Sequence, residues 1–199
     1  MRIPPLARVL LVLAAARSCV CAQGHFRVAV FNYTGRPARE LAPAVDTARR
    51  AFLGAGLDSR WTICAPGGCP QDEDAPPRLE LFLMPRLAGG GPEDGRAGFA
   101  LVGSPERPRA YASFEAALAA SAETMRSLHE VLGCILAHEA GHLLGLHHQA
   151  RGVMRARLET IDMDAAISGW AFSAEEKKAL RAAVKPRPKS EIAGLATTH

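Results

Sequence analysis

The stretch at residues 138–148, which reads HEAGHLLGLHH, constrains this chain more than any other part of its sequence. An α-helix turns about 100° per residue, so His138 and His142 lie one turn apart on the same helix face and can bind one ion together. Glu139 lies next to that face. The spacing therefore predicts a helix that carries two imidazole ligands and an adjacent carboxylate.

Gly145 and His148 extend the same predicted site beyond the end of that helix. Gly145 can adopt the left-handed backbone conformation that ends a helix and turns the chain back. That turn would bring His148 to the ion held by His138 and His142. His147 also follows the glycine, but the spacing selects His148, and we expect His147 at the surface or beside the metal ligands without binding the ion.

Three neutral imidazoles are a typical ligand set for a catalytic zinc ion, which keeps its fourth position open for water. The charge of the metal lowers the pKa of that water toward neutrality. Glu139 is positioned to take the proton when the water attacks a carbonyl group, and to pass it to the leaving amine. We therefore expect one catalytic Zn²⁺ and hydrolysis of a peptide or protein substrate. A zinc-binding protein without catalysis is the alternative, because no oxyanion partner can be named from sequence.

Hydrophobic patterning predicts one α+β domain over residues 23–185, with a twisted mixed sheet of four to five strands backed by two long helices. The apolar stripe of Leu128, Leu132 and Leu136 would anchor the second long helix in the core. The expected strands are residues 25–33, 60–64, 79–84, 99–102 and 110–114. The expected helices open at residues 36–37 and end at Gly54, run over residues 121–144, and run over residues 173–184.

Both ends of the chain are expected to lie outside that domain. Residues 1–22 are typical of a secretory signal peptide, because two arginines precede the apolar run at residues 9–16 and small residues end the segment. The run is too short to span a bilayer, so we expect a secreted or periplasmic protein without stable membrane insertion. Residues 186–199 are predicted to be a disordered tail.

The charge of the chain gives little information about its partners. Cleavage after residue 22 would remove three arginines and no acidic residue, so the formal net charge would fall from +4 to +1. No basic helix interleaved with aromatic residues is present, so we expect no nucleic-acid partner. We expect a monomer.

Cleavage would also leave only Cys64, Cys69 and Cys134. In an exported protein, Cys64 and Cys69 are expected to form a disulfide across a tight loop, with two free thiols as the alternative. Cys134 lies one helical turn before His138, where it is expected to be a small buried hydrophobe. A role as a fourth metal ligand would fill the position that a reaction needs open.

The motif HEAGHLLGLHH followed by Gly152-Val153-Met154 resembles the metzincin clan of zinc metalloproteases. The resemblance implies a secreted zinc endopeptidase in which His138, His142 and His148 bind zinc and Met154 lies beneath the site in a tight turn, the Met-turn. More narrowly, the chain is similar to a family of small secreted bacterial metzincin-like proteins, mostly of unknown function. The late helix that begins near Phe172-Ser173 belongs to this second resemblance.

In two features the sequence departs from this resemblance. Family members often have a longer spacer before the third histidine, and no tyrosine follows Met154, where Arg155 and Arg157 stand instead. The compact spacing in this chain supports His148 as the third ligand. A gluzincin-type peptidase with Glu159 as the third ligand is a separate alternative. Metzincins bind their substrate along an edge strand, and the resemblance places that edge at residues 99–102.

Overall fold

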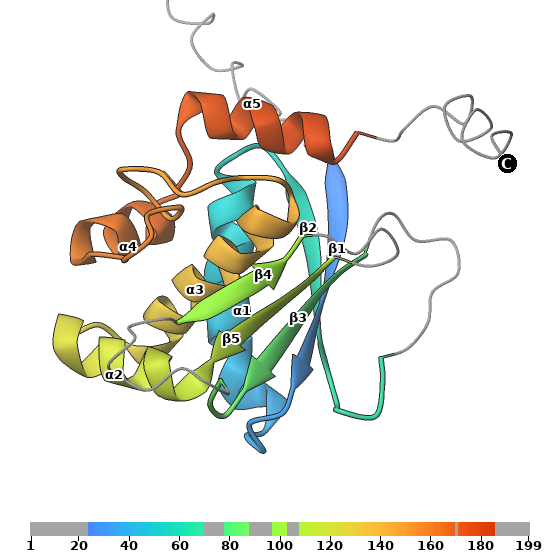
Figure 1. The fold of residues 1–199 in the computed structure, drawn as a ribbon, viewed down its shortest axis with the longest axis vertical. Helices are drawn as coiled ribbons and strands as arrows, with labels where there is room; N and C mark the ends of the chain where they lie inside the picture. The colour runs from blue at the N-terminus through green and yellow to red at the C-terminus, as the bar shows by residue number, and fades with distance from the viewer. Residues whose placement is uncertain (1–23, 70–77, 88–96, 103–107, 170, 186–199) are drawn as a thin grey trace, which may run out of the picture.

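The computed structural model describes residues 24–69, 78–87, 97–102, 108–169 and 171–185, and these form a sheet covered by helices (Figure 1). The predicted signal peptide at residues 1–22 and the predicted tail at residues 186–199 lie outside the described residues.

The sheet has five strands in the order β2-β1-β3-β5-β4. Strands β1, β2, β3 and β5 are parallel, whereas β4 pairs with β5 in the antiparallel sense and forms one edge. The prediction of a mixed sheet is thus confirmed. The strands are β1 (His25–Asn32), β2 (Asp58–Cys64), β3 (Arg78–Met84), β4 (Gly98–Leu101) and β5 (Arg109–Ser113).

Two helices, α1 (Ala38–Leu53) and α3 (Leu128–Leu143), cover one face of the sheet and lie behind it in Figure 1. Their apolar stripes pack on alternate residues of the central strands, such as Val30 and Leu81, which are buried. The two helices approach closely at Gly133, where a side chain would lie 2.6 Å from the backbone oxygen of Ala44. This packing fixes the axis of α3 and hence the residues that it carries.

Four aromatic rings form a row on the other face of the sheet. Phe31, Phe82, Tyr111 and Phe99 occupy paired positions on β1, β3, β5 and β4. Successive ring centroids lie 5.0, 5.1 and 4.8 Å apart, and the rings are stacked. Each ring packs against the ring on the next strand, so the row stabilises the pairing of β1, β3, β5 and β4.

The prediction of one helix over residues 121–144 is wrong. The segment contains the end of α2 (Phe114–Thr124) and the whole of α3, separated by Met125, whose φ of 56° lies in the left-handed region. Ser127 begins α3 with a capping box, in which its hydroxyl accepts from Glu130 N and the Glu130 carboxylate accepts from Ser127 N. These two reciprocal bonds begin a new helix directly before the apolar stripe that starts at Leu128.

The C-terminal region contains one predicted and one unpredicted helix. Helix α5 (Ala174–Ala183) corresponds to the helix predicted over residues 173–184, and it begins with a capping box between Ser173 and Glu176. Helix α4 (Thr160–Ile167), which is not among the predicted helices, precedes it. Within the described residues, no helix has the length and apolar character needed to cross a membrane.

The cysteines lie in two different environments. Cys64 and Cys69 form a disulfide that closes the loop after β2. Cys134 is a free thiol buried in α3, and burial raises its pKa to about 12. A thiol with so high a pKa stays protonated at neutral pH, which suits the packing role and not a ligand role.

Candidate metal centre

Three histidine side chains converge where α3 ends. His142 Nε2 lies 3.0 Å from His138 Nε2 and 3.2 Å from His148 Nε2. His138 and His142 come from the last turns of α3, and His148 follows the helix. In the part of the chain that the structure describes, this is the group of side chains with the composition and spacing to hold a metal ion.

Gly145 makes the reversal that brings His148 back to the helix. Its φ is +86°, in the left-handed region that glycine adopts without strain. The amides of Gly145 and Leu146 donate to the carbonyl oxygens of His142 and Gly141, both at 2.9 Å, so the last helical carbonyls are satisfied. The helix therefore ends in a compact turn instead of fraying.

Backbone carbonyls hold the two helical imidazoles in one tautomer. His138 Nδ1 lies 2.7 Å from Val153 O, and His142 Nδ1 lies 2.8 Å from Leu146 O. A carbonyl oxygen can only accept, so each Nδ1 carries the proton and each Nε2 presents a lone pair. Such outer hydrogen bonds are typical of metal-binding histidines.

Burial keeps these imidazoles neutral. It lowers the pKa of His138 to about 4, against the weaker opposing effect of the hydrogen bond to Val153. Burial also lowers the pKa of His142. Both rings are therefore in the state that a metal ion requires at neutral pH.

The donor set fits zinc. Bonds of about 2.0–2.1 Å in a tetrahedral arrangement place two imidazole nitrogens roughly 3.3 Å apart. The two Nε2 distances from His142 are close to that value. Neutral nitrogens that point their lone pairs at one another at this distance repel, and a cation between them removes the repulsion.

Glu139 lies beside this group on α3 and is almost fully buried, with an exposed fraction of 3%. Among the described residues, nothing donates a hydrogen bond to its Oε2. Burial raises the Glu139 pKa to about 8. Gly98 of β4 contacts the other oxygen, Oε1, and leaves no room for a side chain. The edge strand and the carboxylate are therefore in direct contact.

Met154 lies in a turn that packs against α3. Gly152, with φ +77°, begins the turn, and its carbonyl accepts from Arg155 N at 3.0 Å. Met154 is fully buried, and its sulfur lies against Gly141 of α3. Val153, in the same turn, supplies the carbonyl that orients His138.

Asp162 is a supporting residue that the sequence analysis missed. It is buried on α4, and its carboxylate accepts from Gly152 N at 2.8 Å and Glu159 N at 3.1 Å. Asp162 lies three positions after Glu159, and this spacing is typical of a capping box at the start of a helix. Its contact with Gly152, however, forms only in the tertiary structure. The hydrogen bond fixes the turn that carries Val153.

Other candidate residues lie outside the histidine group. Glu159 flanks α4, and its carboxylate pairs with Arg155 at 2.7 Å. Arg157 is exposed and pairs with Glu123 at 3.2 Å. His147 is exposed, and Cys134 is buried in α3.

Comparison with known proteins identifies the fold. No protein-family model and no curated protein sequence matches the chain. Among solved structures, a zinc-dependent peptidase from Methanocorpusculum labreanum matches with a TM-score of 0.53 and 14% identity over 77% of this chain and 99% of that one. Archaemetzincin from Methanopyrus kandleri matches with a TM-score of 0.50 and 18% identity over 81% and 97%.

Metalloproteinase-II from Bacteroides fragilis also matches, with a TM-score of 0.50 and 14% identity, over 83% of this chain and 55% of that one. The chain therefore spans about half of that protein and nearly all of the two archaeal ones. The protein has a zinc-metallopeptidase fold, and within it the three-histidine group fits a zinc cofactor. The narrower resemblance to small secreted bacterial proteins stays a prediction.

Proposed function

We propose that this protein is a zinc-dependent endopeptidase with His138, His142 and His148 as zinc ligands. The observation that carries the proposal is the convergence of three imidazole nitrogens beside the buried carboxylate of Glu139. When bound, zinc would polarise the substrate carbonyl and lower the pKa of a bound water. The similarity to zinc-dependent peptidase structures supports the same assignment.

Glu139 is the general base in this proposal. Its pKa of about 8 in the metal-free protein means that the carboxyl group binds a proton near neutral pH, and a nearby cation lowers that pKa. The group would accept the proton of the attacking water and donate it to the leaving amine. The Oε2 without a protein partner is the atom available for this exchange.

The free edge of β4 is the proposed site for the peptide substrate. Strand β4 ends the sheet, so one side of its backbone has no strand partner among the described residues. An extended peptide can add to such an edge through backbone hydrogen bonds. Because Gly98 contacts Glu139, a peptide paired with β4 would lie next to the proposed base.

Metal analysis combined with peptide digestion tests the proposal. The purified protein should contain zinc in a one-to-one ratio and cleave members of a peptide library, and a chelator should abolish cleavage until zinc is restored. Glu139→Gln should keep the zinc and lose roughly 10²- to 10⁴-fold in rate. Glu175→Gln, which changes an exposed carboxylate on α5, is the matched control.

Each result leads to a different conclusion. Absence of stoichiometric zinc, or full activity of Glu139→Gln, would refute the proposed mechanism. Stoichiometric zinc without cleavage of any peptide would identify a zinc-binding protein without catalysis.

We also propose that the protein is exported. The disulfide between Cys64 and Cys69 supports this, because disulfides persist in oxidising compartments. Protein recovered from the periplasm or medium of an expressing bacterium should begin at Gln23 by N-terminal sequencing. Recovery of the unprocessed chain from the cytoplasm alone would contradict the proposal.

A further inference from the structure

A cavity of about 320 Å³ lies away from the histidines, where the N-terminal ends of α1, α2 and α3 meet. This position is just beyond the carboxyl ends of the parallel strands β1 and β5, the usual place for ligands in open α/β sheets. The volume is within the range of small-molecule sites. The residues that matter to its chemistry are Arg36, Arg39, Leu41, Phe114, Leu128 and His129.

The floor of the cavity is apolar. Leu41 and Phe114 are buried side chains of the core, and Leu128 is half-buried beside them. Leu132 of α3 completes the floor and is buried as well. A ligand that occupies the cavity must therefore present a hydrocarbon surface to this floor.

The rim is cationic. Arg36 and Arg39 bring two guanidinium groups to it, and Glu40 brings one carboxylate, which lies 3.5 Å from Arg36. That ion pair is solvent-exposed, so it holds Arg36 only weakly. Arg39 pairs with no acidic side chain in the described part of the chain, and its charge is therefore available to a ligand.

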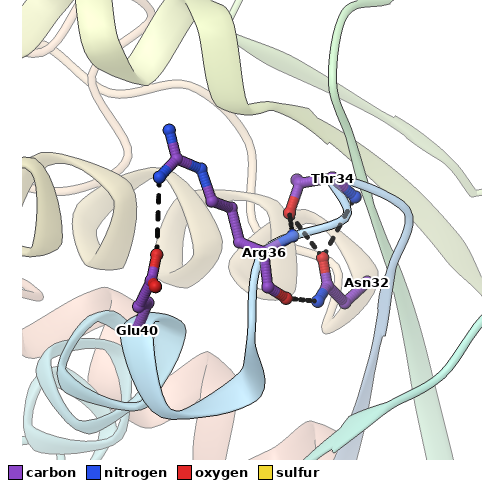
Figure 2. Close-up of polar contacts among 4 residues, drawn as sticks. All are labelled: Asn32, Thr34, Arg36 and Glu40. Carbon is purple, nitrogen blue, oxygen red and sulfur yellow. Dashed lines mark hydrogen bonds and ion pairs between the residues drawn. The ribbon is translucent and has the colours of Figure 1, made fainter.

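The backbone around Arg36 is fixed before any ligand binds. Asn32 Nδ2 donates to the Arg36 carbonyl at 2.7 Å, and Arg36 N donates to Thr34 Oγ1 at 3.1 Å (Figure 2). Asn32 Oδ1 accepts in turn from the Thr34 hydroxyl and amide, at 2.7 and 3.0 Å. The Arg36 guanidinium lies over the Phe114 ring, 5.5 Å from its centroid. Such preorganisation lowers the entropy cost of binding.

The N-terminus of α1 adds to the positive potential at the rim. Its N-cap residue is Pro37, which makes no side-chain hydrogen bond to the first turn, whereas Ser127 caps α3. The first amides of α1 and the helix dipole thus favour an anion beside Arg39.

We propose that this cavity binds a small organic carboxylate whose apolar body rests on the leucines and whose charged group meets Arg36 and Arg39. The apolar floor disfavours a bare anion, and the two guanidiniums disfavour a neutral compound. The site is separate from the metal centre, since the two share no residue. Leu132 precedes His138 by six residues, about 9 Å along the α3 axis.

Three related compounds test the proposal by NMR titration of the zinc-loaded protein. 4-Phenylbutyrate carries both features, 4-phenylbutyramide lacks the charge, and acetate lacks the apolar body. Phenylbutyrate should give saturable shifts of the amides of Arg36, Arg39 and His129, with a Kd on the order of a millimolar or below. The amide should bind at least roughly tenfold more weakly, and acetate should not saturate.

A pair of variants on one helix locates the charge recognition. Arg39→Gln should weaken phenylbutyrate binding roughly tenfold. Arg49→Gln, which changes an exposed arginine farther along α1 that pairs with Asp46, should bind it like the wild type. Absence of saturable binding by phenylbutyrate, equal affinity for the amide, or equal effects of the two variants would overturn the proposal. Zinc content and peptide cleavage are measured separately, so failure here does not bear on the metal centre.

Discussion

Gly98 of β4 lies so close to the carboxylate of Glu139 that no side chain fits between them. The position is confined on a second side, because a Cβ there would lie 2.6 Å from the backbone oxygen of Tyr111. The edge strand and the proposed base are therefore mutually positioned through a glycine. This contact joins residues from the sheet edge and from the helix that carries the histidines.

Gly98→Ala should lower peptide cleavage while zinc content stays at one per chain. The methyl group must displace either the Glu139 carboxylate or β4, and displacement of a reacting group by about 1 Å can cost on the order of 10²-fold in rate. Gly67→Ala is the control, because open space surrounds that glycine. The measurement is kcat and KM for both variants. An unchanged kcat for Gly98→Ala would mean that the contact between Gly98 and Glu139 does not matter for catalysis.

His148→Ala and Glu159→Ala should differ in metal content. His148 Nε2 lies 3.2 Å from His142 Nε2, whereas the carboxylate of Glu159 is engaged with Arg155. We expect His148→Ala to lose stoichiometric zinc and Glu159→Ala to retain it, as measured by elemental analysis after dialysis. The reverse result would establish the gluzincin-type ligand set.

Replacement of the buried, ionisable carboxyl group of Glu139 should change how the stability of the metal-free protein depends on pH. The folded pKa of about 8 is above the usual value of 4.5, so the folded state binds more protons than the unfolded state between these values. The contribution of the Glu139 carboxyl group to stability is fully present below pH 4.5 and is lost as the pH rises through 8. The free energy of unfolding of Glu139→Gln relative to the wild type should therefore increase by a few kcal/mol as the pH rises from 4.5 to 8.

Urea unfolding in the presence of a chelator measures this difference at several pH values. Titration of His138, whose pKa burial lowers to about 4, occurs in both proteins and cancels in the comparison. A stability difference that is constant from pH 4.5 to 8 would show that the Glu139 carboxyl is not held in the protonated form.

Asp162→Ala should weaken zinc binding although Asp162 is not in the histidine group. Its carboxylate holds Gly152 N, and the same turn presents the Val153 carbonyl to His138. Loss of an outer hydrogen bond of this kind lowers metal affinity roughly 10- to 100-fold. Stability should fall by roughly 1.5–3 kcal/mol.

Competition with a fluorescent chelator gives the zinc affinity, and thermal unfolding gives the stability. Asp164→Ala on the same helix is the control, since Asp164 is exposed and pairs with Arg126. Equal zinc affinity of the two variants would mean that the turn does not depend on Asp162.

Local features of the sequence suffice for the parts of this molecule that depend on neighbouring residues. Helical periodicity places His138 and His142 on one face, and Gly145 marks the reversal after them. The strands likewise coincide with their apolar runs, to within two residues at their ends. The apolar stripe of Leu128, Leu132 and Leu136 begins after Met125, so it does not locate the break there, whereas the capping pair Ser127 and Glu130 carries the signal of a new helix.

The contacts between distant segments could not be derived in the same way. The Val153 carbonyl reaches His138, Asp162 reaches Gly152, and Gly98 reaches Glu139 only after the sheet and helices have packed. Backbone carbonyls and glycines have no distinctive side chain, so the sequence does not indicate which distant residue they will contact. The cavity beside Arg39 depends in the same way on three helix ends that are far apart in sequence.

The row of stacked rings across the sheet also sets which residue of β4 meets Glu139. Side chains alternate between the two faces of a strand, so a shift of β4 by one position would turn Phe99 toward the carboxylate in place of Gly98. The stack of Phe99 on Tyr111 would be lost in the same movement. The aromatic row therefore favours the register of β4 in which Gly98 faces Glu139, and in that register the carboxylate of the proposed base has room.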